Sequence, residues 1–102
     1  MSKVQNSGKN DERINPEEAK IIVQSLGKKI KFHRLLKDEN VLQLSLKIGM
    51  SNSHLSLIEN GQIDSPTILT YLNLCKSLEL KPSDLFEILD EIPPFNQYKK
   101  QK

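Results

Sequence analysis

The sequence predicts one all-α domain, and three observations support this prediction. Apolar residues recur at intervals of three and four along several segments, as expected for helices that bury one face. Aromatic residues make up only 5% of the 102 residues, so leucine and isoleucine supply most of the apolar volume, which suits a helical bundle. No two segments alternate polar and apolar residues as a pair of strands would. A chain of this length has room for one small core.

The first helix is expected to begin at Asn15, after a flexible N-terminal arm. Residues 1–14 contain few large apolar side chains and show no periodicity, which is typical of such an arm. Asn15 is a good N-cap, Pro16 suits the first helical position, and the two acidic residues that follow favour the positive end of the helix dipole. The folded domain is therefore expected to span residues 15–91.

The segment after Pro16 carries one amphipathic face. Its inward positions recur at helical spacing and are Ala19, Ile22, Val23, Leu26, Ile30 and His33. Gly27 leaves two alternatives, either one helix from Pro16 to Lys37 or a short leader followed by a second helix. Phe32, Leu35 and Leu36 form a second stripe, for which packing in the core is a simpler interpretation than contact with a partner.

Residues 41–48, VLQLSLKI, fit both a helix and a half-buried strand, because every second residue from Leu42 to Ile48 is apolar. A strand here would have no partner and would leave its backbone hydrogen-bonding groups unpaired. We therefore expect a helix in this segment. Asn40 is placed to cap it and Gly49 to end it.

Three further helices are marked by the residues at their ends. Ser51 caps a short helix over residues 51–60, which closes at Asn60-Gly61. The fourth helix opens at Ser65-Pro66-Thr67, and its apolar set includes Ile68, Tyr71, Leu72, Cys75 and Leu78. The fifth opens at Lys81-Pro82-Ser83-Asp84, contains Leu85, Phe86 and Leu89, and is terminated by Pro93-Pro94. Residues 92–102 form a polar tail that is expected to fray unless Phe95 and Tyr98 dock on the domain or on a partner.

Two short helices joined by Gly49-Met50-Ser51 inside a bundle of five form a helix-turn-helix arrangement. From about Leu26 to Leu89 the chain resembles the lambda-repressor-like, Cro/Xre-type helix-turn-helix family of bacterial and phage transcriptional regulators. The matching residues follow the family's spacing almost without gaps: Leu26-Gly27, Ile30, Arg34, Leu44, Ile48-Gly49-Met50-Ser51, Leu55-Ser56, Ile58-Glu59-Asn60-Gly61, Pro66, Leu78 and Leu80. The resemblance implies a compact five-helix DNA-binding domain, with the motif at about 41–60 and the recognition helix at about 51–60.

The resemblance also implies a function, which is sequence-specific binding of double-stranded DNA to regulate transcription, with repression as the favoured direction. A recognition helix enters the major groove with its N-terminal end, where short polar side chains reach the bases. The residues expected at base edges are Asn52, Ser53, His54, Ser56 and Leu57. Those expected near phosphates are Asn40, Gln43, Ser51, Asn60 and Gln62. Arg34 and Glu59 occupy the family's positions for a structural ion pair.

Small DNA-binding domains of this kind gain affinity by binding a two-fold site as a homodimer. The candidate dimer surfaces are Ala19 to Leu26, Leu85 to Tyr98, and an α-helical pair formed by Leu42 and Leu46, four residues apart. This pair lies where the family usually has exposed charged residues. The family also often places a phosphate-binding glutamine where this chain has Val41.

The segment from Ile48 to Ile63 contains no Lys or Arg, although cations normally supply much of the affinity for DNA. The formal net charge of the whole chain is only +2. This leaves a second interpretation, in which the helix-turn-helix fold recognises a protein, as in an antitoxin or a regulator-binding module, and binds DNA weakly or not at all.

Other classes of function are disfavoured by the sequence. No histidine has an acidic partner that would orient it for nucleophilic catalysis, so we predict that the protein is not an enzyme. One cysteine and two distant histidines do not match a zinc site, no glycine-rich phosphate loop is present, and we predict no metal and no cofactor. The single Cys75 and the lack of a signal peptide or membrane-spanning segment favour a cytoplasmic location. The family resemblance implies that the protein is bacterial or phage-encoded.

Overall fold

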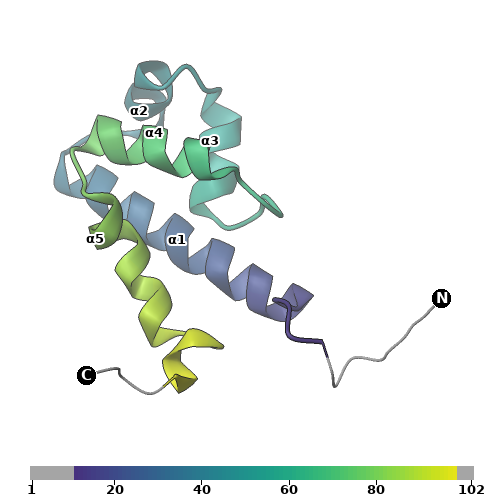
Figure 1. The fold of residues 1–102 in the computed structure, drawn as a ribbon. Helices are drawn as coiled ribbons and strands as arrows, with labels where there is room; N and C mark the ends of the chain where they lie inside the picture. The colour runs from purple at the N-terminus through teal and green to yellow at the C-terminus, as the bar shows by residue number, and fades with distance from the viewer. Residues whose placement is uncertain (1–10, 99–102) are drawn as a thin grey trace.

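The computed structural model describes residues 11–98, and all regular structure within that range is helical (Figure 1). The prediction of an all-α domain with five α-helices is therefore confirmed. The helices are α1 (Pro16–Leu36), α2 (Val41–Lys47), α3 (Asn52–Glu59), α4 (Ile68–Leu78) and α5 (Pro82–Phe86). Two short 3₁₀ helices follow, η3 (Glu87–Glu91) and η4 (Phe95–Gln97). Residues 1–10 of the predicted arm and 99–102 of the predicted tail lie outside the described residues.

α1 is one continuous helix of 21 residues, which decides between the two alternatives left open at Gly27. It begins with a capping box, in which the Asn15 side chain accepts a hydrogen bond from the Glu18 backbone and the Glu18 side chain accepts one from the Asn15 backbone. Gly27 does not break the helix. Its lack of a side chain allows the backbone at the end of α3 to approach α1 closely. A Cβ atom at this position would lie 2.4 Å from the carbonyl oxygen of Ile58 at the end of α3.

α2 confirms the helical interpretation of residues 41–48. Asn40 and Gln43 form a second capping box, in which each side chain accepts a hydrogen bond from the other residue's backbone N–H. The alternation of leucines has a simple explanation, since Leu44 points into the core while Leu42 and Leu46 are exposed at 53% and 72%. Gly49 ends the helix with a φ of +67°, the left-handed conformation that glycine adopts without strain.

The core lies where α1, α3, α4 and α5 meet, with α2 packed on α3. Each of the five helices contributes to the fully buried apolar residues, which are Ile30, Leu44, Leu55, Ile58, Leu74 and Leu85. Burial of one such side chain stabilises the fold by roughly 1.5 to 3 kcal/mol. Cys75 lies in this core as a free thiol, and burial raises its pKa.

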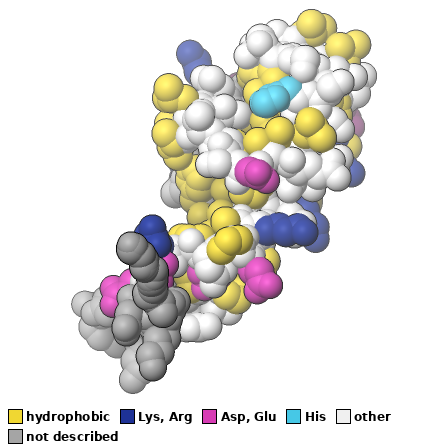
Figure 2. All heavy atoms as spheres, turned by 90° about the vertical axis from the view of Figure 1, so that its right-hand side faces the viewer, with side chains coloured by type: hydrophobic (Ala, Val, Ile, Leu, Met, Phe, Trp, Pro, Cys, Tyr) yellow, Lys and Arg dark blue, Asp and Glu magenta, His cyan; other side chains and the backbone are white. Residues whose placement is uncertain are grey.

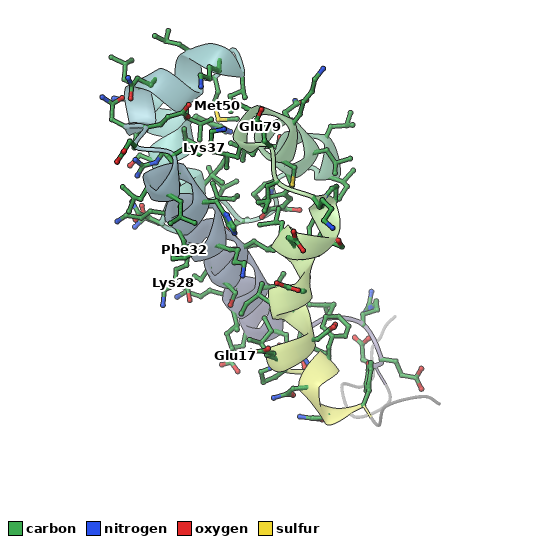
Figure 3. The ribbon with its side chains drawn as sticks, turned by 90° about the vertical axis from the view of Figure 1, so that its left-hand side faces the viewer. Glu17, Lys28, Phe32, Lys37, Met50 and Glu79 are labelled. Atoms are coloured by element: carbon green, nitrogen blue, oxygen red, sulfur yellow. The ribbon has the colours of Figure 1, made fainter. Side chains whose placement is uncertain are left out.

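Contacts at the helix ends close the bundle. Lys37, just after α1, donates a hydrogen bond of 2.7 Å to Glu79, just after α4, and Figure 3 labels both residues at the same end of the molecule. This lysine lowers the pKa of the Glu79 carboxyl group. Both groups are solvent-accessible, so the pair contributes little to stability.

Part of the predicted core is at the surface. The interpretation of Phe32, Leu35 and Leu36 as core residues is wrong, because they are exposed at 55%, 54% and 64%. η3 packs along α1 near Lys29, whose Nζ lies 3.8 Å from Glu87 Oε2. This packing leaves the second apolar stripe of α1 uncovered. Ile68, at the start of α4, is likewise exposed, at 58%.

The fifth α-helix is shorter than predicted, because it does not reach Leu89 or the Pro93-Pro94 pair. α5 ends at Phe86, and the 3₁₀ helix η3 carries Ile88 and Leu89 against the core. The Pro93-Pro94 peptide bond is cis. In the predicted tail, η4 packs against η3, and the rings of Phe95 and Tyr98 meet edge to face at 5.9 Å.

Candidate nucleic-acid interface

α2, the turn at Gly49 and α3 form a compact unit held against α1. The N-cap of α3 is Ser51, whose Oγ accepts a 3.0 Å hydrogen bond from the backbone N–H of His54. Gly61 follows the helix with a φ of +68° and turns the chain back towards α1. In Figure 1, α3 lies at one side of the molecule, with its neighbours α2 and α4 beside it and α1 below it.

α3 divides sharply into a buried side and an exposed end. Leu55, Ile58 and Glu59 are buried. The first three residues of the helix, Asn52, Ser53 and His54, are all exposed. Ser56 is half-buried and Leu57 is 39% exposed, so all five predicted base-edge residues have some accessible surface. The arrangement presents short polar side chains at the N-terminal end of a helix whose other side is fixed in the core.

The residues predicted near phosphates are all exposed and lie before and after α3 in the chain. They are Asn40 and Gln43 at the start of α2, Ser51 before α3, and Asn60 and Gln62 after it. Three of them already have a local role. Asn40, Gln43 and Ser51 use a side-chain oxygen to cap a helix. Their N–H₂ or O–H groups are the donors, and donors are what phosphate oxygens require. The capping partner of Asn40 was missed in the sequence, although the spacing Asn-x-x-Gln marks a capping box.

A buried ion pair joins α1 to the C-terminal end of α3. Arg34 donates from Nε to Glu59 Oε2 at 2.7 Å and from Nη2 to Glu59 Oε1 at 2.9 Å. The two side chains are only 7% and 4% exposed. The hydrogen bonds to Glu59 raise the pKa of Arg34. The pair therefore fixes the angle at which α3 leaves the core.

Arg34 makes one further contact that the sequence did not reveal. Its Nη1 donates a 2.6 Å hydrogen bond to the backbone carbonyl of Glu39 in the turn before α2. One side chain thus connects α1, the start of α2 and the end of α3. A backbone acceptor leaves no signal in the sequence, so only coordinates could identify it.

A family model described as helix-turn-helix matches residues 34–85, about half of the chain. The chain belongs to the Cro/Xre-type helix-turn-helix family. A relative in Bacillus subtilis (strain 168), the uncharacterized HTH-type transcriptional regulator YozG, is 33% identical over 48 residues. The matched segment covers 47% of this chain and 57% of that relative. No solved structure gives a significant match.

Charge is sparse on the surface around α3. Figure 2, which views the molecule from the side of α3, shows a histidine surrounded mainly by uncharged polar and apolar atoms, with an acidic side chain below this patch and the basic side chains further away. Lys20 of α1 is one cation near this surface, because it lines a groove together with Asn60 and Gln62. The sequence analysis did not connect Lys20 with the motif, since 31 residues separate it from Ser51.

Residues 11–98 contain no group of three or more His, Cys, Asp or Glu side chains placed to hold a metal ion. Within the same range, no helix combines the length and apolar character required to cross a bilayer.

Proposed function

We propose that this protein is a sequence-specific double-stranded DNA-binding transcriptional regulator, acting as a repressor, that inserts α3 into the major groove. Membership of the Cro/Xre-type family and the relative named as a transcriptional regulator support this proposal. The major groove of B-DNA admits an α-helix and displays a distinct donor and acceptor pattern for each base pair. The protein performs no catalysis and requires no cofactor for this role.

The observation that carries the proposal is the division of α3. Its exposed N-terminal end offers Asn52, Ser53 and His54, while its C-terminal end is fixed by Glu59. The Asn52 amide has the donor and acceptor needed for a bidentate contact with adenine, and Leu57 is suited to a thymine methyl group. The exposed amides and hydroxyls at both ends of the motif position the protein on the phosphate backbone.

The direct test is selection of binding sites from random duplex DNA with the full chain, followed by titration of the selected duplex at two salt concentrations. A recurring two-fold motif, bound far more tightly than scrambled DNA, is the expected result. Enrichment of no sequence at either salt concentration would refute the proposal.

Asn52→Ala is expected to weaken binding to the selected duplex by about 1 to 3 kcal/mol per contact and to relax the preference at one base pair of each half-site. Asn73→Ala is the matched control, because Asn73 is an exposed asparagine on α4. Equilibrium binding to a set of duplexes with single substitutions measures both effects. If Asn52→Ala weakened binding to all duplexes equally, or if the two variants lost the same affinity, Asn52 would not contact a base.

The proposed assembly on DNA is a homodimer that uses the uncovered side of α1. An apolar groove between α1 and η3 is lined by Phe32, Ile88 and Ile92. Figure 3 shows Phe32 and Lys28 on the side of α1 that faces away from α4. The α1 edge of the groove is basic, with Lys28 and Lys29, whereas η3 carries Glu87, Asp90 and Glu91. A two-fold axis along the groove would therefore set the basic edge of one copy against the acidic edge of the other.

Phe32→Ser is expected to raise the dimer dissociation constant at least about tenfold, because tenfold is only 1.4 kcal/mol, less than the value of burying one phenylalanine. Leu46→Ser is the control, since Leu46 is an exposed apolar residue on α2. Sedimentation equilibrium measures both constants. A greater loss of dimer affinity for Leu46→Ser would place the dimer interface on α2. If the unmodified protein formed no dimer, the proposed homodimer would be refuted.

One observation favours a second candidate function, that of a protein-interaction module. Leu42 and Leu46 place two exposed leucines on one surface of α2, and no cation lies between Ile48 and Ile63. A module of this kind would bind a protein through α2 and show no preference among duplexes. Site selection separates the two candidates.

A further inference from the structure

A groove runs between the N-terminal half of α1 and the turn that follows α3. Its polar lining comes from Lys20 and Gln24 on α1 and from Asn60, Gln62 and Asp64 on the turn. It adjoins the C-terminal end of α3, so it borders the surface proposed to read DNA. The groove exists because α1 begins at Pro16, well before the segment that packs on α3 at Gly27.

The turn is pressed closely onto α1 at this point. Gly61 adopts a φ of +68°, and a Cβ atom there would lie 2.7 Å from the Cα of Gln24. Only glycine avoids both the backbone strain and the collision. The spacing between α1 and the turn is therefore fixed by backbone contact, and the side chains of Lys20 and Gln62 are held on one surface.

The groove offers donors for a single anion. Lys20 is exposed and forms no ion pair with any residue in 11–98. Gln24, Asn60 and Gln62 add amide N–H₂ groups, none of which has a hydrogen-bond partner among the described residues. Asp64 is the acidic group on the same lining and opposes an anion by like charge.

We infer that this groove holds one phosphate of the DNA backbone, with Lys20 as the charged contact and Gln24, Asn60 and Gln62 as neutral donors. The inference rests on the proposed function and adds α1 to the DNA-binding surface. A cation on α1 supplies charge that the segment from Ile48 to Ile63 lacks. Contacts of this kind position a protein on the duplex without reading its sequence.

The experiment compares salt dependence for the full chain and for Lys20→Gln on the selected duplex. Neutralising one phosphate contributes about 0.9 to the slope of log K against log salt, so Lys20→Gln should reduce the slope by about 0.9 for each bound copy. The preferred sequence should not change. Lys76→Gln, at an exposed lysine near the end of α4, is the control and should leave the slope as it is.

Asp64→Asn provides an independent measurement on the same groove. Removing this negative charge should tighten binding at low salt, and the gain should shrink as salt screens the charge. Titration with inorganic phosphate alone, followed by the backbone amide signals of Asn60 and Gln62, should produce no saturable shift if the site requires a duplex.

Three results would overturn the inference in distinguishable ways. An unchanged slope for Lys20→Gln, with sequence-specific binding intact, removes the phosphate site and leaves the proposed function standing. Saturable binding of inorganic phosphate assigns the groove to free phosphate instead of a duplex. Absence of sequence-specific binding in the unmodified protein removes both proposals.

Discussion

Replacing Arg34 with methionine is expected to lower the free energy of unfolding by about 3 to 5 kcal/mol, the usual cost of removing one partner from a buried ion pair. The variant would leave the Glu59 carboxylate, only 4% exposed, without its two hydrogen bonds. The carbonyl of Glu39 would also lose a donor. Chemical denaturation monitored by circular dichroism measures the change.

A double-mutant cycle isolates the pair itself. Glu59→Leu alone should also destabilise strongly, whereas Arg34→Met together with Glu59→Leu should cost much less than the two single losses added. Lys37→Met is a matched control, because its partner Glu79 is largely exposed and such pairs are worth about 1 kcal/mol or less. Additive losses at Arg34 and Glu59 would mean that the pair has no structural role.

Gly27→Ala is expected to destabilise the domain by about 2 to 3 kcal/mol, even though alanine is the better helix former by about 1 kcal/mol. The added Cβ would lie 2.4 Å from the carbonyl oxygen of Ile58 and 2.7 Å from that of Glu59. Both atoms belong to the backbone at the end of α3, so the contact is relieved only by moving α3 away from α1.

Gly49→Ala is the control for this prediction. Gly49 has a φ of +67°, but a Cβ there would meet no atom within 4 Å. Its substitution should therefore cost only the backbone strain, about 1 kcal/mol. If Gly27→Ala proved no more destabilising than Gly49→Ala, the close approach of α1 and α3 would be refuted.

The starts of α1, α2 and α3 could be predicted because capping is local. Asn15, Asn40 and Ser51 each accept a hydrogen bond from a backbone N–H three residues later, and that spacing is visible in the sequence. The continuity of α1 could not be predicted, because Gly27 is explained by the carbonyl of Ile58, 31 residues away.

Exposure was harder to predict than helicity. Periodicity identifies the apolar stripes of α1, but only the positions of the elements packed on α1, which are α3, α4, α5 and η3, determine which stripe is covered. The stripe at Phe32 was therefore assigned to the core incorrectly.

The candidate site, like the fold, could be predicted only in part from the sequence. The polar end of α3 follows from helical spacing, and the Arg34 and Glu59 positions follow from the family resemblance. The groove that brings Lys20 beside Gln62 depends on the path of the turn after α3, so no spacing in the sequence marks it.

Amide chemical-shift mapping with the selected duplex shows whether the exposed end of α3 contacts DNA. The largest shifts on adding DNA are expected at residues 52–57, with smaller shifts at Asn40, Gln43 and Gln62. Shifts confined to α2 around Leu42 and Leu46, with residues 52–57 unchanged at saturation, would contradict this expectation.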